Sequence, residues 1–307
     1  MGKYFPELPP QAKCSRCRER ARIGLPSHNA RFCPDCYLHF FTTAVRRALK
    51  HMRIPRTEPL MIAISGGKDS LTVWDVLQDL GYHTRGLHIN LGVGRFSEAA
   101  REAIQDFAQS RGLAWTEYDL KEEFGYYLPQ VQKRFRSKVC SVCGRLKRQF
   151  LNRLAVREGY SSVVTGHNLD DEAGRLLGNL VGNRQHYVKK HSPYLPSPHP
   201  AIPAKIKPLY RVEIREILIY AELKDIRFAQ EQCPYSKGAT SHYFKEAMDL
   251  LEKRMPGTKR QFLFAYADAR KGREQEAGRE FGSCKYCGQP AYADICGVCS
   301  LGAQIAG

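Results

Sequence analysis

Cysteines carry the clearest chemical signal in this sequence, because thiolates bind zinc and iron and also act as nucleophiles. The chain has 11 cysteines, which fall into three groups. The two outer groups each contain two Cys-x-x-Cys pairs: Cys14, Cys17, Cys33 and Cys36 near the start, and Cys284, Cys287, Cys296 and Cys299 near the end. Four thiolates complete the tetrahedral shell of a structural Zn²⁺, so each outer group predicts a zinc-ribbon module.

The middle group consists of only three residues, Cys140, Cys143 and Cys233. Three thiolates leave a four-coordinate shell incomplete, so this group is either a metal centre with an open position or a reactive sulfur site. The basic residues that surround Cys140 and Cys143 in the sequence are expected to lower the pKa of both thiols. Cys233 follows Cys143 by 90 residues. On spacing alone, it could equally be an unrelated buried thiol.

A second candidate site is the glycine-rich segment SGGKDS (65–70), which directly follows the apolar run LMIAI (60–64). Its two glycines let the backbone N–H groups approach an anion closely, and the helix expected after it adds a positive end. Ser65 and Ser70 supply hydroxyl groups and Lys68 supplies a positive charge. The spacing differs from the GxxxxGK[ST] loop of common ATPases. A phosphate-binding loop of another kind is therefore predicted.

These groups must be positioned by strands and helices that alternate along the chain. Apolar patterning predicts strands at 60–64, 84–90, 114–120 and 161–168, and helices at 37–52, 70–80, 97–112 (capped by Ser97), 212–223 and 243–255. This order predicts an α/β fold with a doubly wound, mostly parallel sheet, whose ligands bind at the carboxyl ends of the strands. SGGKDS and GHNLDD (166–171) both stand at that edge.

Charge points to a polyanionic partner. The chain has 307 residues and a formal net charge of +17, and aromatic residues lie among basic ones in KRFRSK and RQHYVKKHSPY. This pattern favours nucleic acid. The proline-rich, basic segment 184–210 is expected to be extended or mobile, either as a surface linker or as a contact to the substrate. The N-terminus lacks a signal peptide, no run of about 18 apolar residues predicts a membrane span, and paired cysteines of this kind suit a reducing cytoplasm.

Two motifs resemble those of the PP-loop ATP pyrophosphatases, which cleave ATP between the α and β phosphates. SGGKDS resembles their pyrophosphate-binding loop, and GHNLDDEAGRLLGNL (166–180) resembles the second signature of the tRNA-modifying branch. The resemblance implies an adenine nucleotide alpha hydrolase-like fold. It also implies binding of ATP and Mg²⁺ by Ser65, Gly66, Gly67, Lys68, Asp69, Ser70, His88, Asn90, Gly166, Asp170 and Asp171. Asp171 is favoured over Asp170 for the adenylation step, although charge alone does not distinguish them.

The arrangement of the whole chain resembles the tRNA 2-thiouridine synthetases of this branch. The resemblance implies that Cys140, Cys143 and Cys233 hold a 4Fe-4S cluster with one iron free of protein ligands. An alternative in which the same cysteines form a persulfide and a disulfide stays open. Lys147 resembles a catalytic lysine of the family, although a role in contacting phosphate is equally physical. The implied catalytic residues are Cys140, Cys143, Cys233, Lys68, Asp69, Lys147 and Asp171.

The function implied by this resemblance is ATP-dependent 2-thiolation of a tRNA uridine. We expect adenylation of the C2 oxygen and its replacement by sulfur at the T-loop uridine (position 54), with a ubiquitin-like thiocarboxylate protein as donor and a homodimeric enzyme. The alternatives are the wobble uridine (position 34), a PP-loop ligase acting on a small molecule, and an RNA-binding protein with a vestigial nucleotide site. The expected domains are 1–53, 54–270 and 271–307. The arginine-rich N-terminal module is the stronger candidate for RNA contact, because Lys285 is the only basic residue between the C-terminal ligands.

Overall fold

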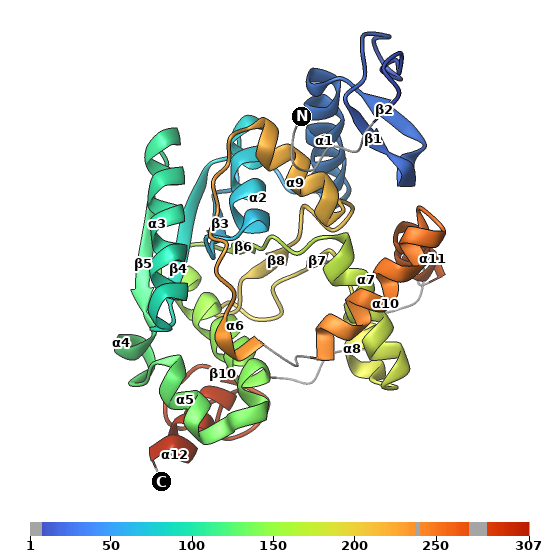
Figure 1. The fold of residues 1–307 in the computed structure, drawn as a ribbon. Helices are drawn as coiled ribbons and strands as arrows, with labels where there is room; N and C mark the ends of the chain where they lie inside the picture. Colours follow the sequence, from blue (N-terminus) through green and yellow to red (C-terminus); the bar gives the residue numbers. More distant parts are fainter. Residues whose placement is uncertain (1–7, 237–239, 270–280, 307) are drawn as a thin grey trace.

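A six-stranded sheet forms the centre of the molecule (Figure 1). The computed structural model describes residues 8–236, 240–269 and 281–306. The strands follow the order β5-β4-β3-β6-β8-β7, and all neighbours are parallel except β7, which pairs antiparallel with β8. Their bounds are β3 (Leu60–Ala63), β4 (Thr84–Asn90), β5 (Trp115–Asp119), β6 (Ser162–Val164), β7 (Tyr194–Leu195) and β8 (Ala204–Ile206). The predicted mostly parallel sheet is confirmed.

Helices cover both faces of this sheet, as a doubly wound fold requires (Figure 1). One face packs against α1 (Pro34–His51), α2 (Lys68–Asp79), α3 (Gly94–Arg111) and α9 (Ile214–Leu223). The other packs against α5 (Leu128–Phe135) and α6 (Val139–Arg157). Alternate residues of β3 belong to opposite apolar clusters, since Ile62 faces the first group of helices and Met61 the second. The strands are therefore buried on both sides, which explains their short, continuous apolar runs.

A further group of helices gathers around α7 (Leu169–Val181), which follows β6. It packs against α8 (Gln185–Lys189), α10 (Thr240–Arg254) and α11 (Thr258–Ala269). Most expected helices are present with shifted ends. The helix predicted from Ser97 begins three residues earlier at Gly94, and the Ser97 hydroxyl accepts a hydrogen bond from the Val93 backbone N–H at 3.0 Å inside its first turn. The structural description contains no helix long and apolar enough to cross a membrane.

The prediction that residues 184–210 are extended or mobile was wrong. This segment contains α8, β7 and β8, and β8 lies inside the sheet between β6 and β7. Ala204 and Ile206 are buried, but Lys205 lies between them and Lys207 follows them, so the sequence does not show the apolar run of a central strand. The prolines stand before and after β8 rather than within it, so they do not interrupt its hydrogen bonds.

The N-terminal module is a hairpin of β1 (Ile23–Leu25) and β2 (Ala30–Phe32), joined by the short helix η1 (Pro26–His28) and followed directly by α1. It shares its core with the sheet domain. Phe41 of α1 stacks on Tyr220 of α9 with ring centroids 4.2 Å apart, and the Tyr37 hydroxyl donates to the Glu216 carbonyl at 2.6 Å. The module is thus built into the main apolar cluster.

The C-terminal module consists of β9 (Gly282–Ser283), β10 (Pro290–Ala291) and α12 (Gly297–Ala306). It lies against α6, on the far side of the sheet from α1 (Figure 1). The Gln149 amide of α6 donates a hydrogen bond to Cys296 Sγ at 3.1 Å. The first residues of the expected C-terminal domain, 271–280, lie outside the described residues.

Candidate active site

The glycine-rich loop connects β3 to α2 at the carboxyl edge of the sheet. Gly66 adopts φ +71°, and a Cβ atom at this position would lie 2.5 Å from the Ala100 carbonyl oxygen of α3. Gly67 occupies the N-cap of α2, which begins at Lys68. The loop therefore requires glycine at position 66 for two independent reasons, the left-handed backbone and the close approach of α3.

Hydrogen bonds hold this loop in a tight turn. The Ser70 hydroxyl accepts from the Ser65 backbone N–H at 3.1 Å and donates to the Gly67 carbonyl at 2.9 Å. From outside the loop, the Ala229 N–H donates to the Gly66 carbonyl at 2.9 Å. Lys68 lies in the first turn of α2, where the helix end is positive, so the loop presents an anion-binding surface before any ligand arrives.

The GHNLDD segment packs directly on this loop. A Cβ atom at Gly166 would lie 2.7 Å from the Asp69 carbonyl carbon, so only glycine permits this contact. Asn168 caps α7 by accepting from the Asp171 N–H at 3.0 Å, and its amide donates to Asp69 Oδ1 at 3.0 Å. One asparagine thus ties the start of α7 to the start of α2.

Asp69 and Asp171 face the same space between the two helix ends. Burial raises the pKa of Asp69, the Lys68 ammonium opposes this shift, and the Asp171 carboxylate raises the pKa further. Two neighbouring carboxylates beside an anion-binding loop provide the oxygen ligands that Mg²⁺ prefers. Both residues stay partly accessible, with side chains 28% and 23% exposed.

Asp170 has different surroundings from Asp171. Its side chain is only 7% exposed, forms an ion pair with Lys259 and accepts from the Ile214 N–H at 2.8 Å. All of these contacts join α7 to α11 and α9. The geometry therefore favours Asp171, as predicted, for contact with a metal–nucleotide ligand.

His88 and Asn90 lie on β4, one strand along from the loop. The buried His88 ring places Nδ1 3.0 Å from the Ile64 carbonyl, while its Nε2 has no hydrogen-bond partner in the described structure. Burial lowers the pKa of His88 and favours the neutral imidazole. The Asn90 side chain accepts from the Gly92 N–H at 2.9 Å. The unpaired His88 nitrogen leaves one polar contact available at this edge.

Cys140 and Cys143 lie in the first two turns of α6, and Cys233 lies immediately before the short helix η3 (Pro234–Ser236). Cys140 Sγ lies 3.2 Å from the Tyr235 carbonyl, so the two segments touch. Burial raises the pKa of Cys140 and Cys143, and the nearby Cys233 thiolate raises both further, whereas Lys147 lowers both. The expectation that basic neighbours lower these pKa values was wrong, because burial outweighs the ammonium. The contact of Cys140 with the Tyr235 carbonyl nevertheless places the segment that carries Cys233 beside the start of α6.

Sulfur separations distinguish the outer cysteines from the middle ones. Within each outer group all four sulfurs lie within 4.8 Å of one another. The Cys17–Cys33 and Cys287–Cys296 pairs are 3.6 and 3.7 Å apart, close to the roughly 3.8 Å expected for tetrahedral Zn–S bonds of about 2.3 Å. Within the part of the chain described, the three middle sulfurs form no such group.

Thiolate-stabilising contacts accompany the first ligand of each outer group. Burial raises the pKa of Cys14, but N–H groups of Cys17, Cys33 and Arg16 bring it down to about 6. Backbone N–H groups, first that of Cys296, lower the pKa of Cys284 to about 6 as well. Donors aimed at sulfur are typical of zinc knuckles, since the bound form is the thiolate.

Sequence reasoning missed several charged residues around the site. Lys245 of α10 forms an ion pair with Asp171, and Lys207 forms one with the buried Glu172 at 2.9 Å. His191 lies 3.2 Å from the same carboxylate. These partners come from distant segments whose local sequence is that of ordinary amphipathic helices or loops. The one signal in the sequence is the acidic cluster at the start of α7, because carboxylates that become buried require positively charged partners.

A third polar group also escaped prediction. His28, Glu213 and Glu216 bring their ligand atoms within 4.8 Å of one another at the junction of the N-terminal module and α9. Arg260 of α11 lies among them, 3.0 Å from His28 Nε2 and 3.7 Å from Glu216. Because the guanidinium already supplies a cation, this group acts as a polar junction between the module, α9 and α11.

Comparison with known proteins agrees with this geometry. Residues 13–38 match a family model described as the N-terminal LIM domain of 2-thiouridine synthetase TtuA, and residues 41–238 match the PP-loop domain. The tRNA-5-methyluridine(54) 2-sulfurtransferase of Thermus thermophilus is 40% identical over 293 residues, which are 94% of this chain and 90% of that protein. The same-named protein of Pyrococcus horikoshii is 36% identical over 94% and 93% of the two chains.

A solved structure gives the same result for the fold. The U34-tRNA thiolase NcsA from Methanococcus maripaludis, determined with its 4Fe-4S cluster, superposes with a TM-score of 0.82 at 25% identity and covers 95% of both chains. The chain is a member of the PP-loop tRNA 2-thiouridine synthetase family, alongside the tRNA-5-methyluridine(54) 2-sulfurtransferases.

Proposed function

We propose that this protein is a tRNA sulfurtransferase that uses ATP to replace the C2 oxygen of uridine 54 with sulfur. The observation that carries the proposal is the placement of an anion-binding loop and paired carboxylates at the same sheet edge as three coupled thiols. Two relatives named for position 54 are 40% and 36% identical to this chain, whereas the U34 thiolase is 25% identical. This difference supports the T-loop uridine over the wobble uridine.

The adenylation step rests on residues 65–70, Asp69 and Asp171. The loop N–H groups and Lys68 would bind the pyrophosphate of ATP, and Asp69 and Asp171 would hold Mg²⁺ on it. The neutral His88, with its unpaired Nε2, is available to the nucleotide at the next strand. The uridine C2 oxygen then attacks the α phosphate and pyrophosphate leaves, while the positive charges of the loop offset the charge that develops.

The sulfur step rests on Cys140, Cys143 and Cys233. A 4Fe-4S cluster is proposed at these three cysteines because the solved structure of NcsA, which shares this fold over 95% of both chains, contains such a cluster. When bound, such a cluster supplies an iron with no protein ligand that can hold sulfide. Lys147, one turn after Cys143, acts on both thiols and on His88. Its ammonium is therefore placed to stabilise negative charge that develops between the bound nucleotide and the sulfur atoms.

RNA binding is assigned first to the N-terminal module, with zinc at both outer cysteine groups. Five arginines of this module are exposed: Arg16, Arg18, Arg20, Arg22 and Arg31. The proposal also keeps the division into 1–53, 54–270 and 271–307, a ubiquitin-like protein as sulfur donor, a homodimer and a cytoplasmic location. These parts rest on the family resemblance.

Reconstitution with purified components tests the function. The protein loaded anaerobically with iron and sulfide is mixed with ATP, sulfide and an unmodified tRNA transcript, and the nucleosides are analysed by mass spectrometry. We expect 2-thiouridine together with tRNA-dependent release of AMP and pyrophosphate. Replacing Cys233 with Ala should abolish thiolation and cluster loading but leave pyrophosphate release. Thiolation by that variant at the wild-type rate would refute the role of the three cysteines.

A further inference from the structure

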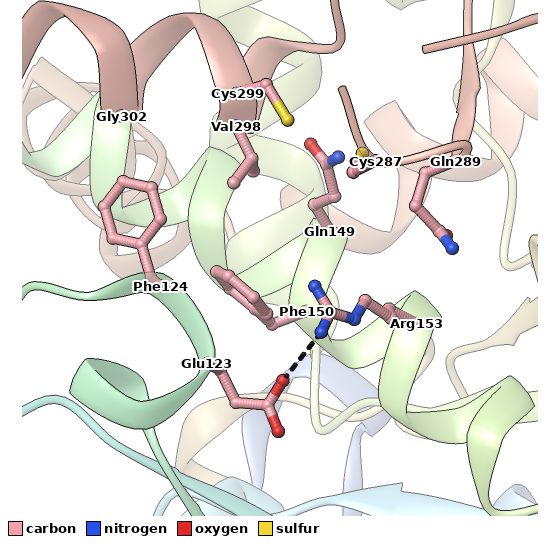
Figure 2. Close-up of a pocket in the computed structure, with 10 residues that line it drawn as sticks. All are labelled: Glu123, Phe124, Gln149, Phe150, Arg153, Cys287, Gln289, Val298, Cys299 and Gly302. Carbon is pink, nitrogen blue, oxygen red and sulfur yellow. Dashed lines mark ion pairs between the residues drawn. The ribbon is translucent and has the colours of Figure 1, made fainter. Parts of the chain in front are cut away.

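A cavity of about 230 Å³ lies between α6, α4 (Leu120–Phe124) and the C-terminal module (Figure 2). It is separate from the loop and carboxylates at the sheet edge. Its lining includes two aromatic rings, two carboxamides, an ion pair and two cysteines of the module: Phe124, Phe150, Gln149, Gln289, Arg153 with Glu123 at 3.3 Å, Cys287 and Cys299 (Figure 2). The cavity thus has apolar walls with a few polar groups, which is the composition of a binding site.

The two glutamines provide directional hydrogen bonds. The Gln149 side-chain N–H donates a hydrogen bond to Cys296 Sγ, which fixes the side chain. Its carboxamide oxygen can then accept a hydrogen bond from a ligand. The Gln289 backbone carbonyl accepts from the Cys284 N–H at 2.9 Å, so the residue is held by its backbone. Its side-chain amide has no hydrogen-bond partner in the described ranges and lies at the cavity (Figure 2). A carboxamide offers adjacent donor and acceptor groups, which match the edge of a nucleobase.

Size restricts the occupant. Pockets for drug-sized ligands span roughly 300–1,000 Å³, so a cavity of about 230 Å³ is too small for ATP. It suits one flat ring system. The rings of Phe124 and Phe150, whose centroids are 6.0 Å apart at 65°, form an edge-to-face pair on one side. Phe150 is only 2% exposed and belongs to the core, so Phe124 is the ring of this pair that a base could contact. Aromatic side chains are common platforms for single unpaired bases.

The surroundings of the cavity carry positive charge. The exposed face of α6 bears Arg145, Lys147 and Arg148, whereas Arg153 and Arg157 are ion-paired with Glu123. Tyr286, between two zinc ligands and next to Cys287, is 74% exposed. A base-sized cavity beside a basic helix and an exposed tyrosine complements a single strand of nucleic acid, whose phosphates and bases repeat along one direction.

The cavity lies further along the helix that carries the reactive cysteines. Gln149 and Arg153 follow Cys143 by six and ten residues, which at about 1.5 Å per residue is roughly 9 to 15 Å along α6. That distance corresponds to about three to four steps of a stacked strand at 3.4 Å per nucleotide. A strand that places one nucleotide at the thiols can therefore place a near neighbour at the cavity.

We propose that this cavity binds one unpaired base of the tRNA, splayed out within about four nucleotides of the uridine that is thiolated. This inference rests on the proposed function and extends it, because it assigns RNA recognition to the C-terminal module and α6 as well as to the arginine-rich N-terminal module. The zinc site has a direct part in it, since Cys287 lines the cavity and Gln149 donates to Cys296.

Abasic scanning of the RNA, combined with one protein variant, tests the proposal. Synthetic tRNAs with single abasic nucleotides on either side of the target uridine are titrated against the zinc- and cluster-loaded protein by filter binding. We expect one abasic position to weaken binding by roughly tenfold. Gln289→Ala should weaken binding of the intact tRNA by roughly fivefold and reduce the penalty of that same abasic position by the same factor. Gln109→Ala, at an exposed glutamine of α3, should match the wild type in both measurements.

Zinc content and thermal unfolding of Gln289→Ala should equal those of the wild type, which separates recognition from folding. Independent penalties for the abasic position and for Gln289→Ala would overturn the proposal. So would normal tRNA affinity of the variant combined with slower transfer from a protein sulfur donor, which would assign the cavity to the donor's tail. Absence of tRNA binding by the wild type would refute the proposed function itself.

Discussion

Two adjacent aspartates on α7 have different surroundings and therefore different expected roles. Asp171 is partly accessible beside Asp69 and pairs with Lys245, whereas Asp170 is buried against Lys259. We predict that Asp171→Asn abolishes tRNA-dependent pyrophosphate release while the protein stays folded. Asp170→Asn should instead destabilise the fold by about 1–3 kcal/mol, because it removes the buried partner of Lys259 and leaves only the exposed carboxylate of Asp249. Denaturant titration and a pyrophosphate assay on both variants check this. Equal folding stability of the two would contradict the assignment.

His191 gives the protein a pH-dependent stability. Burial lowers its pKa to about 4 from 6.5, against the attraction of Glu172 and with the repulsion of Lys207. Between pH 6.5 and 4 this histidine is protonated in the unfolded chain but stays neutral in the folded chain. The free energy of unfolding is therefore highest above pH 6.5 and decreases as the pH falls towards 4. The expected loss is roughly 3 kcal/mol.

His191→Gln removes the titrating imidazole. The free energy of unfolding of this variant should therefore change less between pH 6.5 and 4 than that of the wild type. Denaturant titration at each pH measures the difference. His51→Gln, at an exposed position of α1, should follow the wild type and thus controls for zinc loss in acid. Parallel curves for His191→Gln and the wild type would contradict the burial argument.

At the residue scale, the sequence predicted the candidate site residues better than it predicted the ion-pair partners of those residues. The two outer cysteine groups, the Cys140–Cys143 pair, residues 65–70 and the acidic pair were recognisable because their residue types and spacing are local. Cys233 joins its group only through the family resemblance. The pairing of Asp171 with Lys245 and of Glu172 with Lys207 depends on how α7 meets α10 and β8, which no local pattern encodes. The direction of the Cys143 pKa shift could not be predicted from the sequence either, because it is set by the burial of the thiol in the folded protein.

At the element scale, α6 links the middle cysteines to the C-terminal module. Cys140 and Cys143 stand in its first two turns, and Gln149, further along the helix, contacts Cys296 of that module. The loop at 65–70 and the turn at Gly166 are likewise fixed by helix starts that touch. The site is therefore carried by rigid helix ends, which suits a reaction that must hold a nucleotide and sulfur in register.

The two zinc modules should differ in their importance for folding. Cys14 belongs to the large apolar cluster that includes α1, α2 and α9, whereas Cys284 and Cys296 form a small cluster of their own. We predict that Cys14→Ser loses one zinc and lowers the midpoint of thermal unfolding of the whole chain. Cys284→Ser should lose one zinc but leave the main transition within a few degrees. Metal analysis and calorimetry measure both, and a reversed order would contradict this packing argument.

Elements with clean apolar periodicity were predicted well, and elements rich in lysine and proline were not. β3 and β4 follow directly from their apolar runs. β8 was missed because Lys205 and Lys207 interrupt its pattern, although both lysines are largely buried by neighbouring segments. Burial of lysine depends on tertiary contacts, such as that between Lys207 and Glu172, so a local sequence window indicates a loop here.

At the scale of the whole molecule, a net charge of +17 makes RNA binding dependent on salt. If the exposed arginines of the N-terminal module contact phosphates, each one removed should lower the slope of log K against log salt concentration by about 1. We predict that the double variant Arg20→Ser and Arg22→Ser lowers this slope by about 2. Arg56→Ser, on the amino side of β3 and outside the N-terminal module, should leave this slope unchanged. Filter binding at several salt concentrations gives the slopes, and an unchanged slope in the double variant would contradict the assignment.

The central claim is that the ATP loop and the three middle cysteines act together on uridine 54. Position-resolved mass spectrometry of tRNA from a strain lacking this protein, complemented with the wild type or with Cys233→Ala, tests it most directly. The account predicts that 2-thiouridine at position 54 is absent in the deletion strain, returns with the wild type and stays absent with Cys233→Ala. Retention of 2-thiolation at position 54 in the deletion strain, or its loss only at position 34, would contradict the account.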